Sequence, residues 1–449
     1  MTHPMTAAVL AGADADELAR CPAPTSTLGL CLRKSEETQF DGVPESEIDV
    51  RQSLHLDEVP LPELAPDEAL VAVMAGALNY NTVWSAMFRP VSTFRFLERF
   101  GRMSASDKRH DLDRHILGSD ASGVVVRVGE GVRHFGIGDR VVIGTLATDE
   151  QDPIAQADGM LPAAQRAWGF ETNYGGLAHY TVVKATQLLP KAAHLTWEEA
   201  ASTTLCLMTA YRMLIGDNGA RAKLGELVLI WGAAGGLGAY GVQLAKAAGC
   251  RVAGVVNGPK KAALARDLGC DLVIDRSEAA DECPNGFTDP VGWKWLGSRI
   301  RGHFGEDVHH VFEHVGRETF GASVYLARRG GTIVTCGSST GYRHEFDNRH
   351  LWMKLKRIIG SHGGHYHEEW QANELVRRGV IRPTLSGMYD LETAAEGVRL
   401  MHSNEHLGKL GVRCLAPKDG QGVTDPEKRA AIGAENCSLL GWQPPSAAR

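Results

Sequence analysis

The second half of the chain alternates short apolar runs with longer amphipathic runs. The apolar runs predict strands at 227–231, 251–256, 271–274, 308–312 and 331–335, and the run at 357–361 is a sixth candidate. The amphipathic runs predict helices between them, including 239–248, 260–268 and 318–326. Residues 276–293 interrupt the alternation and are expected to form an insertion. Because strands that alternate with helices pair in parallel, this half predicts an α/β fold with helices on both faces of a parallel sheet.

The first half follows a different pattern, in which short apolar runs are separated by turns rich in glycine and proline. Such runs lie within 53–86, 118–142 and 175–188, and they predict a barrel-like, mostly antiparallel domain. A single helix is expected at 198–214. Beyond residue 370 the pattern predicts helices at 370–378 and 391–402 and strands at 386–390 and 408–415. From residue 417 the chain is polar and rich in Pro and Gly, which predicts a tail that lies on the surface or is partly disordered.

Composition narrows the classes of function. The formal net charge of −7 argues against nucleic-acid binding, which needs a basic surface. No run of about 18 apolar residues occurs, so we expect no membrane helix. The N-terminal stretch lacks the basic start and apolar core of a signal peptide. Nine cysteines are scattered without a CxxC pair, which predicts a cytoplasmic protein without a structural zinc lobe.

The most informative stretch is 227–249, where an apolar strand leads into a cluster of small residues and then into a helix. This strand–loop–helix order is typical of a dinucleotide site, and it favours a nucleotide cofactor over a purely structural turn. Glycines let the backbone approach a pyrophosphate, and the start of the helix offers unpaired N–H groups to it. The residues expected against the pyrophosphate are Gly235, Gly236, Leu237 and Gly238.

The residues after the second strand of this half indicate which nucleotide binds. NAD-dependent enzymes carry Asp or Glu there to bind the ribose 2′-hydroxyl. This chain has Asn257 followed by Gly-Pro-Lys-Lys, so Lys261 is a candidate to meet a 2′-phosphate. The pattern therefore favours NADPH, although both lysines could also lie on a solvated helix start. Thr209 is expected near the nicotinamide.

Three glycine motifs carry a family resemblance. Gly118 to Gly129, Gly138-Asp-Arg-Val141 and the loop 232–238 resemble the medium-chain dehydrogenase/reductase superfamily. Its zinc alcohol dehydrogenases have Gly-His-Glu where this chain has Gly118-Ser-Asp120, and a metal-binding Cys where this chain has Asn79-Tyr-Asn81. Neither position suits zinc, so the resemblance implies a zinc-free reductase with no bound metal.

Four longer strings narrow the resemblance further. They are Asn79-Tyr-Asn-Thr-Val-Trp84, Trp168-Gly-Phe-Glu-Thr-Asn-Tyr-Gly-Gly176, Phe312 to Ser323 and Leu351 to His362. Together they are similar to crotonyl-CoA carboxylase/reductases over nearly the whole chain. The resemblance implies a GroES-like β-barrel catalytic domain, 1–205 with 362–449 (tail 417–449), and a Rossmann NADPH-binding domain with a doubly wound parallel sheet, 206–361.

The same resemblance implies the reaction. Such enzymes are oxidoreductases that act on CH–CH groups with NADP as acceptor. A hydride goes from NADPH to Cβ of a 2-enoyl-CoA, and the enolate Cα captures CO2 to give an alkylmalonyl-CoA, a polyketide extender unit. An enoyl-CoA reductase without carboxylation is one alternative, and a non-catalytic NADPH-binding protein is another. A homo-oligomer, dimer or tetramer, is also implied, with dimers pairing through the nucleotide-domain sheet.

Four residues match family positions that would hold CO2 beside Cα, and they are Asn81, Phe170, Glu171 and His362. Asn81 could instead be a turn or strand-end residue. Phe170, expected to wall the pocket through its position and backbone N–H, could instead be a plain core residue. Glu171 could instead form a surface ion pair, and His362 could be a hydrogen-bonded core residue. If Asn79 and Asn81 lay on one strand, both side chains would point to the same face and both would be candidates. Asn81 is favoured, and Asn79 stays in reserve. His365 leaves open which histidine faces CO2.

The chain departs from the family at Gly363 and Gly364, where the family commonly has Phe and Ala. Losing an aromatic ring opens a space on the order of 100 Å³, which is costly if left empty. We expect the acyl tail of a longer or bulkier enoyl-CoA to fill it, unless a neighbouring side chain does so or the glycines serve a turn. Basic residues expected near CoA phosphates are Lys294, Arg301 and Arg349.

Overall fold

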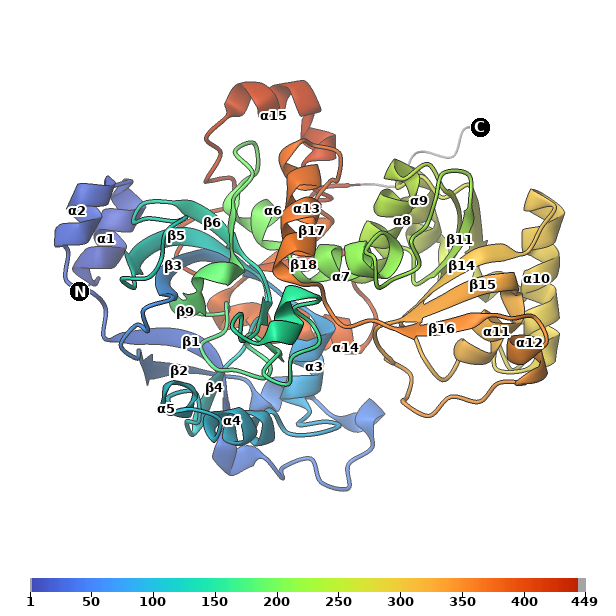
Figure 1. Ribbon diagram of the computed structural model, residues 1–449, viewed down its shortest axis with the longest axis horizontal. Coiled ribbons are helices and arrows are strands. Elements are labelled where there is room, and N and C mark those ends of the chain that lie inside the picture. Colours follow the sequence, from blue (N-terminus) through green and yellow to red (C-terminus); the bar gives the residue numbers. More distant parts are fainter. Residues whose placement is uncertain (1, 443–449) are drawn as a thin grey trace. The chain divides into compact units, whose positions relative to one another are not determined.

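The computed structural model describes residues 2–442, which form two compact units (Figure 1). The first unit contains residues up to 205 together with 365–440, and the second contains 206–364 with residues 441 and 442. The second boundary therefore falls at 364/365, whereas the sequence predicts 361/362. No helix among residues 2–442 is long and apolar enough to cross a membrane.

The first unit is built around one mixed sheet with the order β10-β6-β5-β3-β18-β17, and β9 also pairs with β3. The strands are β3 (Glu68–Ala77), β5 (Ala121–Val128), β6 (Arg140–Ile143), β9 (Tyr180–Lys184), β10 (Leu188–Pro190), β17 (Leu385–Asp390) and β18 (Lys409–Arg413). Every pair is antiparallel except β17 with β18. All residues of β3 are buried, so this strand is the axis of the core. The predicted barrel-like, mostly antiparallel domain is confirmed.

A smaller antiparallel sheet lies beside this core, with the order β2-β1-β4. Its strands are β1 (Ser26–Arg33), β2 (His55–Pro60) and β4 (Arg114–Ile116), and a two-stranded ribbon joins β7 (Leu146–Ala147) to β8 (Arg166–Ala167). The helices of this unit include α1 (Pro4–Ala11), α2 (Ala15–Arg20), α3 (Tyr80–Ala86), α4 (Thr93–Gly101), α5 (Ala105–Lys108), α13 (Tyr366–Arg377) and α14 (Ala394–His402). The loop between β4 and β5 and the turn after β8 carry the polar residues discussed below.

The second unit is a six-stranded, wholly parallel sheet with the order β13-β12-β11-β14-β15-β16. Its strands are β11 (Leu227–Trp231), β12 (Arg251–Val256), β13 (Leu272–Asp275), β14 (Val308–Glu313), β15 (Ala327–Thr335) and β16 (Arg357–Gly360). The chain runs outward from β11 to β13 and then returns to the other side of β11 at β14. This order is that of a doubly wound dinucleotide-binding sheet, whose switch point lies between β11 and β14.

Two predicted elements are wrong in detail. The predicted helix 198–214 is two helices, α6 (Trp197–Ala201) and α7 (Leu205–Leu214), separated by residues 202–204. The predicted insertion 276–293 contains the start of α10 (Pro290–Phe304), the helix between β13 and β14. The other helices of this unit include α8 (Gly236–Ala247), α9 (Pro259–Asp267) and α11 (Phe320–Leu326). Asp289 caps α10 by accepting a hydrogen bond from the Val291 N–H at 2.9 Å, and Pro290 follows it at the first helical position.

The structure describes the tail as far as residue 442. It contains α15 (Pro426–Ile432), and it packs on the first unit. The Trp197 N–H donates to the Gln421 carbonyl at 2.8 Å, and Leu439 is buried with its N–H on the Leu385 carbonyl at 2.8 Å. The described tail therefore lies on the surface of the first unit, which is one of the two predicted alternatives.

Candidate active site

The glycine loop of the second unit joins β11 to α8 at the switch point of the sheet. Gly235 is the N-cap residue, so the N–H groups of Gly236, Leu237 and Gly238 open the helix without intrahelical acceptors. A Cβ on Gly238 would lie 2.2 Å from the Gly232 carbonyl oxygen, so a side chain there would break the turn. The loop therefore presents free N–H groups and a positive helix end, which suits a pyrophosphate.

The loop after β12 binds an acidic group that the sequence analysis did not predict. Asn257 is exposed, and the N–H of the next residue, Gly258, donates to Oδ1 of Asp275 at 2.8 Å. Asp275 comes from the end of β13, and its Oδ1 also accepts the Ser277 N–H and hydroxyl at 3.0 and 2.8 Å. Burial acts to raise the pKa of Asp275, but these hydrogen bonds hold it below its usual value. The carboxylate therefore fixes the loop.

Two cations interact electrostatically beside this loop. Lys261, on the first turn of α9, is partly buried, and burial together with the positive charge of Arg276 lowers its pKa. Arg276 is exposed and lies 3.8 Å from the Glu318 carboxylate. Both positive charges favour a nearby anion, which would share Arg276 with Glu318. Arg276 was not foreseen, although it directly follows the strand end that carries Asp275. Thr209 is a buried residue of α7 in the same unit.

Asn79 and Asn81 do not share a strand face, so that part of the prediction is wrong. Asn79 is the N-cap residue of α3 and Asn81 lies inside that helix. The Asn79 amide donates to Oδ2 of Asp120 at 2.8 Å, and the Lys409 ammonium binds the same oxygen at 2.8 Å. Lys409 and Asp120 are 2% and 0% exposed, so this is a wholly buried ion pair. Asn79 thus belongs to a structural network around Asp120.

Asn81 has a different partner. Its Nδ2 donates to the Ser119 hydroxyl at 2.8 Å, and its Oδ1 is buried without a hydrogen-bond partner among residues 2–442. The side chain therefore keeps unused hydrogen-bonding capacity in a buried place, where such capacity is costly unless a ligand uses it. Across the same described range, no group of three His, Cys, Asp or Glu side chains could hold a metal ion.

Phe170 and Glu171 lie in a tight turn after β8. The Ala167 carbonyl accepts the N–H groups of Phe170 and Glu171 at 3.3 and 2.7 Å, and Oε2 of Glu171 accepts the Ala167 N–H at 2.8 Å. The backbone N–H of Phe170 is therefore engaged within the turn, which weakens the expectation that Phe170 acts through it. The Phe170 ring packs at 5.8 Å, centroid to centroid, against Phe96 of α4.

The histidine region lies beyond β16, around the unit boundary. His362 is exposed, whereas Gly363 and Gly364 are buried. Gly363 has φ +54°, a left-handed conformation that glycine adopts without strain, so a turn requirement explains at least this glycine. His365 caps α13: its Nδ1 accepts the Glu368 N–H at 3.5 Å, and Glu368 accepts the His365 N–H at 3.0 Å. This capping role leaves His362 as the less committed histidine.

The three basic CoA candidates differ in what they contact. Arg301 is paired with Asp307 at 2.8 Å and Arg349 with Asp347 at 2.6 Å, both on exposed surface. Lys294 is exposed on α10. Arg349 and Arg301 would each have to share or exchange an acidic partner in order to bind a phosphate.

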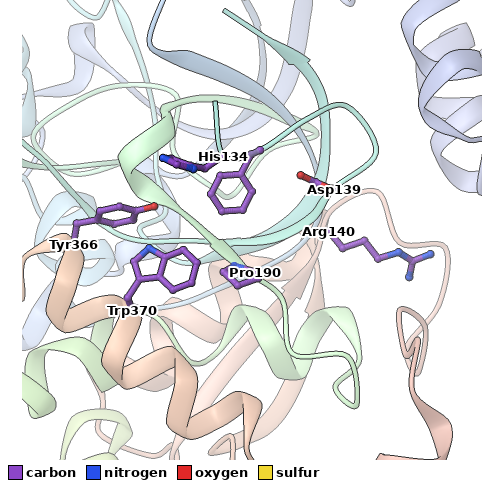
Figure 2. A pocket seen from close by; sticks show the side chains of 7 residues that line it. His134, Asp139, Arg140, Pro190, Tyr366 and Trp370 are labelled. Carbon is purple, nitrogen blue, oxygen red and sulfur yellow. The ribbon is translucent and has the colours of Figure 1, made fainter. Parts of the chain in front are cut away.

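A cavity of about 660 Å³ lies elsewhere in the first unit, between the β5–β6 turn and α13 (Figure 2). It is lined by His134, Phe135, Asp139, Arg140, Pro190, Tyr366 and Trp370. In Figure 2 the rings of Tyr366 and Trp370 lie on one side of the space, whereas the Arg140 guanidinium extends away from them. None of the predicted site residues lines this cavity, so its volume has no bearing on the predicted chemistry.

Family profiles match both halves of the chain. The alcohol dehydrogenase GroES-like domain matches residues 65–193, and the zinc-binding dehydrogenase profile matches residues 236–378. With the antiparallel first unit and the doubly wound second unit, these matches define the medium-chain dehydrogenase/reductase class. The predicted fold, a GroES-like domain plus a Rossmann domain, is confirmed.

Individual relatives narrow the class. A crotonyl-CoA reductase of Streptomyces avermitilis is 52% identical over 92% of this chain and 94% of its own length. A crotonyl-CoA carboxylase/reductase of Cereibacter sphaeroides is 36% identical over 82% of this chain and 85% of its own. A solved structure, the 2-octenoyl-CoA carboxylase reductase CinF in complex with NADP and 2-octenoyl-CoA, has TM-score 0.94 and 51% identity, covering 97% of this chain and 98% of CinF. The chain belongs to the crotonyl-CoA reductase and carboxylase/reductase family, as its motifs predict.

Proposed function

We propose that this chain is an oxidoreductase that catalyses the NADPH-dependent reductive carboxylation of a medium-chain 2-enoyl-CoA, giving an alkylmalonyl-CoA. The observation that carries the proposal is its 51% identity, over 97% of the chain, to a 2-octenoyl-CoA carboxylase reductase whose structure contains NADP and 2-octenoyl-CoA. The glycine loop at the switch point and the cationic pair of Lys261 and Arg276 support NADPH as the cofactor.

NADPH, when bound, supplies a hydride to Cβ of the enoyl thioester and leaves as NADP⁺. The N–H groups of Gly236, Leu237 and Gly238 would hold its pyrophosphate, with Gly235 keeping the backbone close, while Asn257 and Lys261 would lie at the ribose end. Thr209 is our candidate beside the nicotinamide. Addition of the hydride to Cβ leaves the electron pair on Cα and the thioester oxygen, which together form an enolate. Cα of this enolate then forms the new bond to the carbon of CO2.

CO2 carries no charge and no net dipole, so placed hydrogen-bond donors and a shaped pocket must orient it. We assign the donor role to the Asn81 amide, which gives one N–H to Ser119 and carries a second. Phe170 would wall the pocket through its ring, and Glu171 would order a water or a neighbouring donor. We assign a second donor role to the exposed His362, because His365 is used as a helix cap. Water must be kept from Cα, since a proton there gives the saturated acyl-CoA instead.

The acyl chain is the finer part of the proposal. Gly363 and Gly364 are buried and lack side chains, and we propose that they leave room for a chain longer than crotonyl. Lys294, Arg301 and Arg349 remain our candidates for the CoA phosphates. A clear preference for crotonyl-CoA over 2-octenoyl-CoA in kcat/KM would contradict the assignment of the two glycines.

The decisive experiment follows NADPH oxidation with 2-octenoyl-CoA, with and without bicarbonate plus carbonic anhydrase, and identifies the products by mass. A product heavier than the saturated acyl-CoA by one CO2 is expected. Saturated acyl-CoA alone, even at high CO2, would make the protein a plain enoyl-CoA reductase and would remove the roles given to Asn81, Glu171 and His362. Absence of any turnover would favour the non-catalytic alternative.

We further infer a homo-oligomer built on the open edge of the second sheet. β16 is the edge strand, and Ile358 on it and Trp352, Met353 and Leu355 just before it are 38%, 61%, 54% and 66% exposed. An exposed, apolar sheet edge is typical of a strand that pairs with another copy. Sedimentation velocity should give a dimer or tetramer. All nine cysteines are free, which supports a reducing, cytoplasmic location.

A further inference from the structure

Ser119 lies in the short connection between β4 and β5 and is completely buried. Its hydroxyl donates to the Trp168 carbonyl oxygen at 2.7 Å. A serine hydroxyl has one hydrogen, so once that hydrogen is given to Trp168 the oxygen can only accept from Asn81. The hydrogen bond of 2.8 Å between them must therefore come from Nδ2 of Asn81, and the reversed amide would place two acceptors against each other.

The orientation of Asn81 is thus set by Ser119. With the amide fixed this way, one N–H points at Ser119 and the second N–H is left to donate elsewhere. Oδ1 faces a place without a partner among residues 2–442. The Ser119 hydroxyl donates to Trp168 and accepts from Asn81, so both interactions are with protein groups. Any effect of Ser119 on the reaction would therefore pass through Asn81.

Ser119 also anchors the turn that carries Phe170 and Glu171. The Ser119 carbonyl accepts the Thr145 hydroxyl at 2.7 Å, and the Thr145 carbonyl accepts the Trp168 N–H at 2.8 Å. Ser119, Thr145 and Trp168 therefore close a ring of three hydrogen bonds, all between buried residues. Trp168 adjoins the turn in which Ala167 holds Phe170 and Glu171. One residue consequently fixes both Asn81 and the origin of the neighbouring turn.

From this geometry we propose that Ser119 is the positioning residue of the CO2 subsite: it orients the Asn81 amide and keeps it in register with the Phe170–Glu171 turn. The inference rests on the proposed reductive carboxylation. It predicts a selective consequence, because hydride transfer to Cβ does not need CO2 to be held. When the amide is free to turn, the enolate still forms but is protonated more often than it is carboxylated.

The test is Ser119→Ala in the full-length enzyme, with the ratio of carboxylated to saturated product measured by mass at several CO2 concentrations. We expect NADPH oxidation to persist, the ratio to fall about tenfold, as loss of one positioned hydrogen bond implies, and the KM for CO2 to rise. Ser119→Thr, which keeps the hydroxyl, should restore the ratio. An unchanged ratio and KM in Ser119→Ala would overturn the inference.

Ser122, three residues further along the chain, offers a matched control. Ser122 on β5 is also 0% exposed, and its hydroxyl donates to the Trp197 carbonyl at the same 2.7 Å, without a link to Asn81. Ser122→Ala should keep the wild-type ratio, and a fall equal to that of Ser119→Ala would reveal a general structural effect and contradict our inference. If Ser119→Ala does not fold, Ser119→Cys, with a weak donor of similar size, carries the same test. Failure of the wild type to carboxylate would instead refute the proposed function.

Discussion

Glu369 allows a stability prediction that depends on pH. This residue of α13 is 2% exposed, and neither carboxyl oxygen has a hydrogen-bond partner of normal geometry among residues 2–442. A Cβ on Gly144 would lie 2.0 Å from Oε2, so the carboxyl occupies the space that this glycine leaves. Burial raises the pKa of Glu369 well above its usual value, and the backbone N–H groups of Thr145 and Leu146 offset only part of that rise.

The sign of the effect follows from proton binding. The folded state holds the Glu369 proton at a pH where the unfolded chain, with a carboxyl pKa near 4.5, has lost it. The contribution of this proton to stability is complete below pH 4.5 and is lost as pH rises toward the folded pKa. Over that window wild-type stability falls by about 1.4 kcal/mol per pH unit, a loss that an uncharged glutamine does not suffer.

The perturbation is therefore Glu369→Gln, and the assay is the difference in Tm between variant and wild type from pH 5 to pH 8. We expect the difference to grow in favour of the variant as pH rises. Glu374→Gln on the same helix is the control, because hydrogen bonding to Arg378 lowers the pKa of Glu374. That stabilisation is present above the unfolded pKa, so the control should show a small, constant loss over the same range. A Glu369→Gln difference that stays flat or shrinks with rising pH would refute the reasoning.

Three further outcomes follow from the described contacts. Lys261→Ala combined with Arg276→Ala should raise the KM for NADPH about tenfold or more while leaving that for NADH nearly unchanged, which steady-state kinetics with both nucleotides measures. Gly238→Ala should abolish binding of the dinucleotide in a fluorescence titration, since its Cβ would lie 2.2 Å from the Gly232 carbonyl, and wild-type affinity would disprove the placement of the loop. Lys409→Met should cost about 3–5 kcal/mol of unfolding free energy in urea because it leaves Asp120 charged and unpaired, whereas Asp120→Asn with Lys409→Met should recover part of that loss.

The parallel sheet and its glycine loop could be predicted because their signals are local. Each strand is a short apolar run, and the loop 232–238 combines glycines with a strand before it and a helix after it. The α10 helix was missed although Asp289-Pro290 is a helix-start signal, because the surrounding polar residues hide the amphipathic pattern. The split of 198–214 depends on how residues 202–204 pack, which periodicity does not record.

The site was harder to predict because its contacts join distant parts of the chain. Asn79 and Asn81 are two residues apart, yet one binds Asp120 and the other Ser119, because a helix begins at Tyr80 and turns their side chains apart. Asp275 enters the loop after β12 from a different strand, so a search of the residues after β12 could not find it. Family motifs supplied the candidate residues, whereas the hydrogen bonds that orient them come from tertiary structure.

Two consecutive buried residues of the first unit, Ser119 and Asp120, have different roles. Asp120 binds Lys409, Asn79, and the Leu205 N–H at 2.6 Å, and thereby ties β5 to β18 and to the starts of α3 and α7. Ser119 binds Asn81 and Trp168, which carry or adjoin groups assigned to CO2. Loss of the Asp120 contacts should therefore appear as loss of stability, and loss of the Ser119 contacts as a change of product. Since neighbouring residues share the same burial and backbone, the contrast between these two kinds of effect separates a role in folding from a role in capturing CO2.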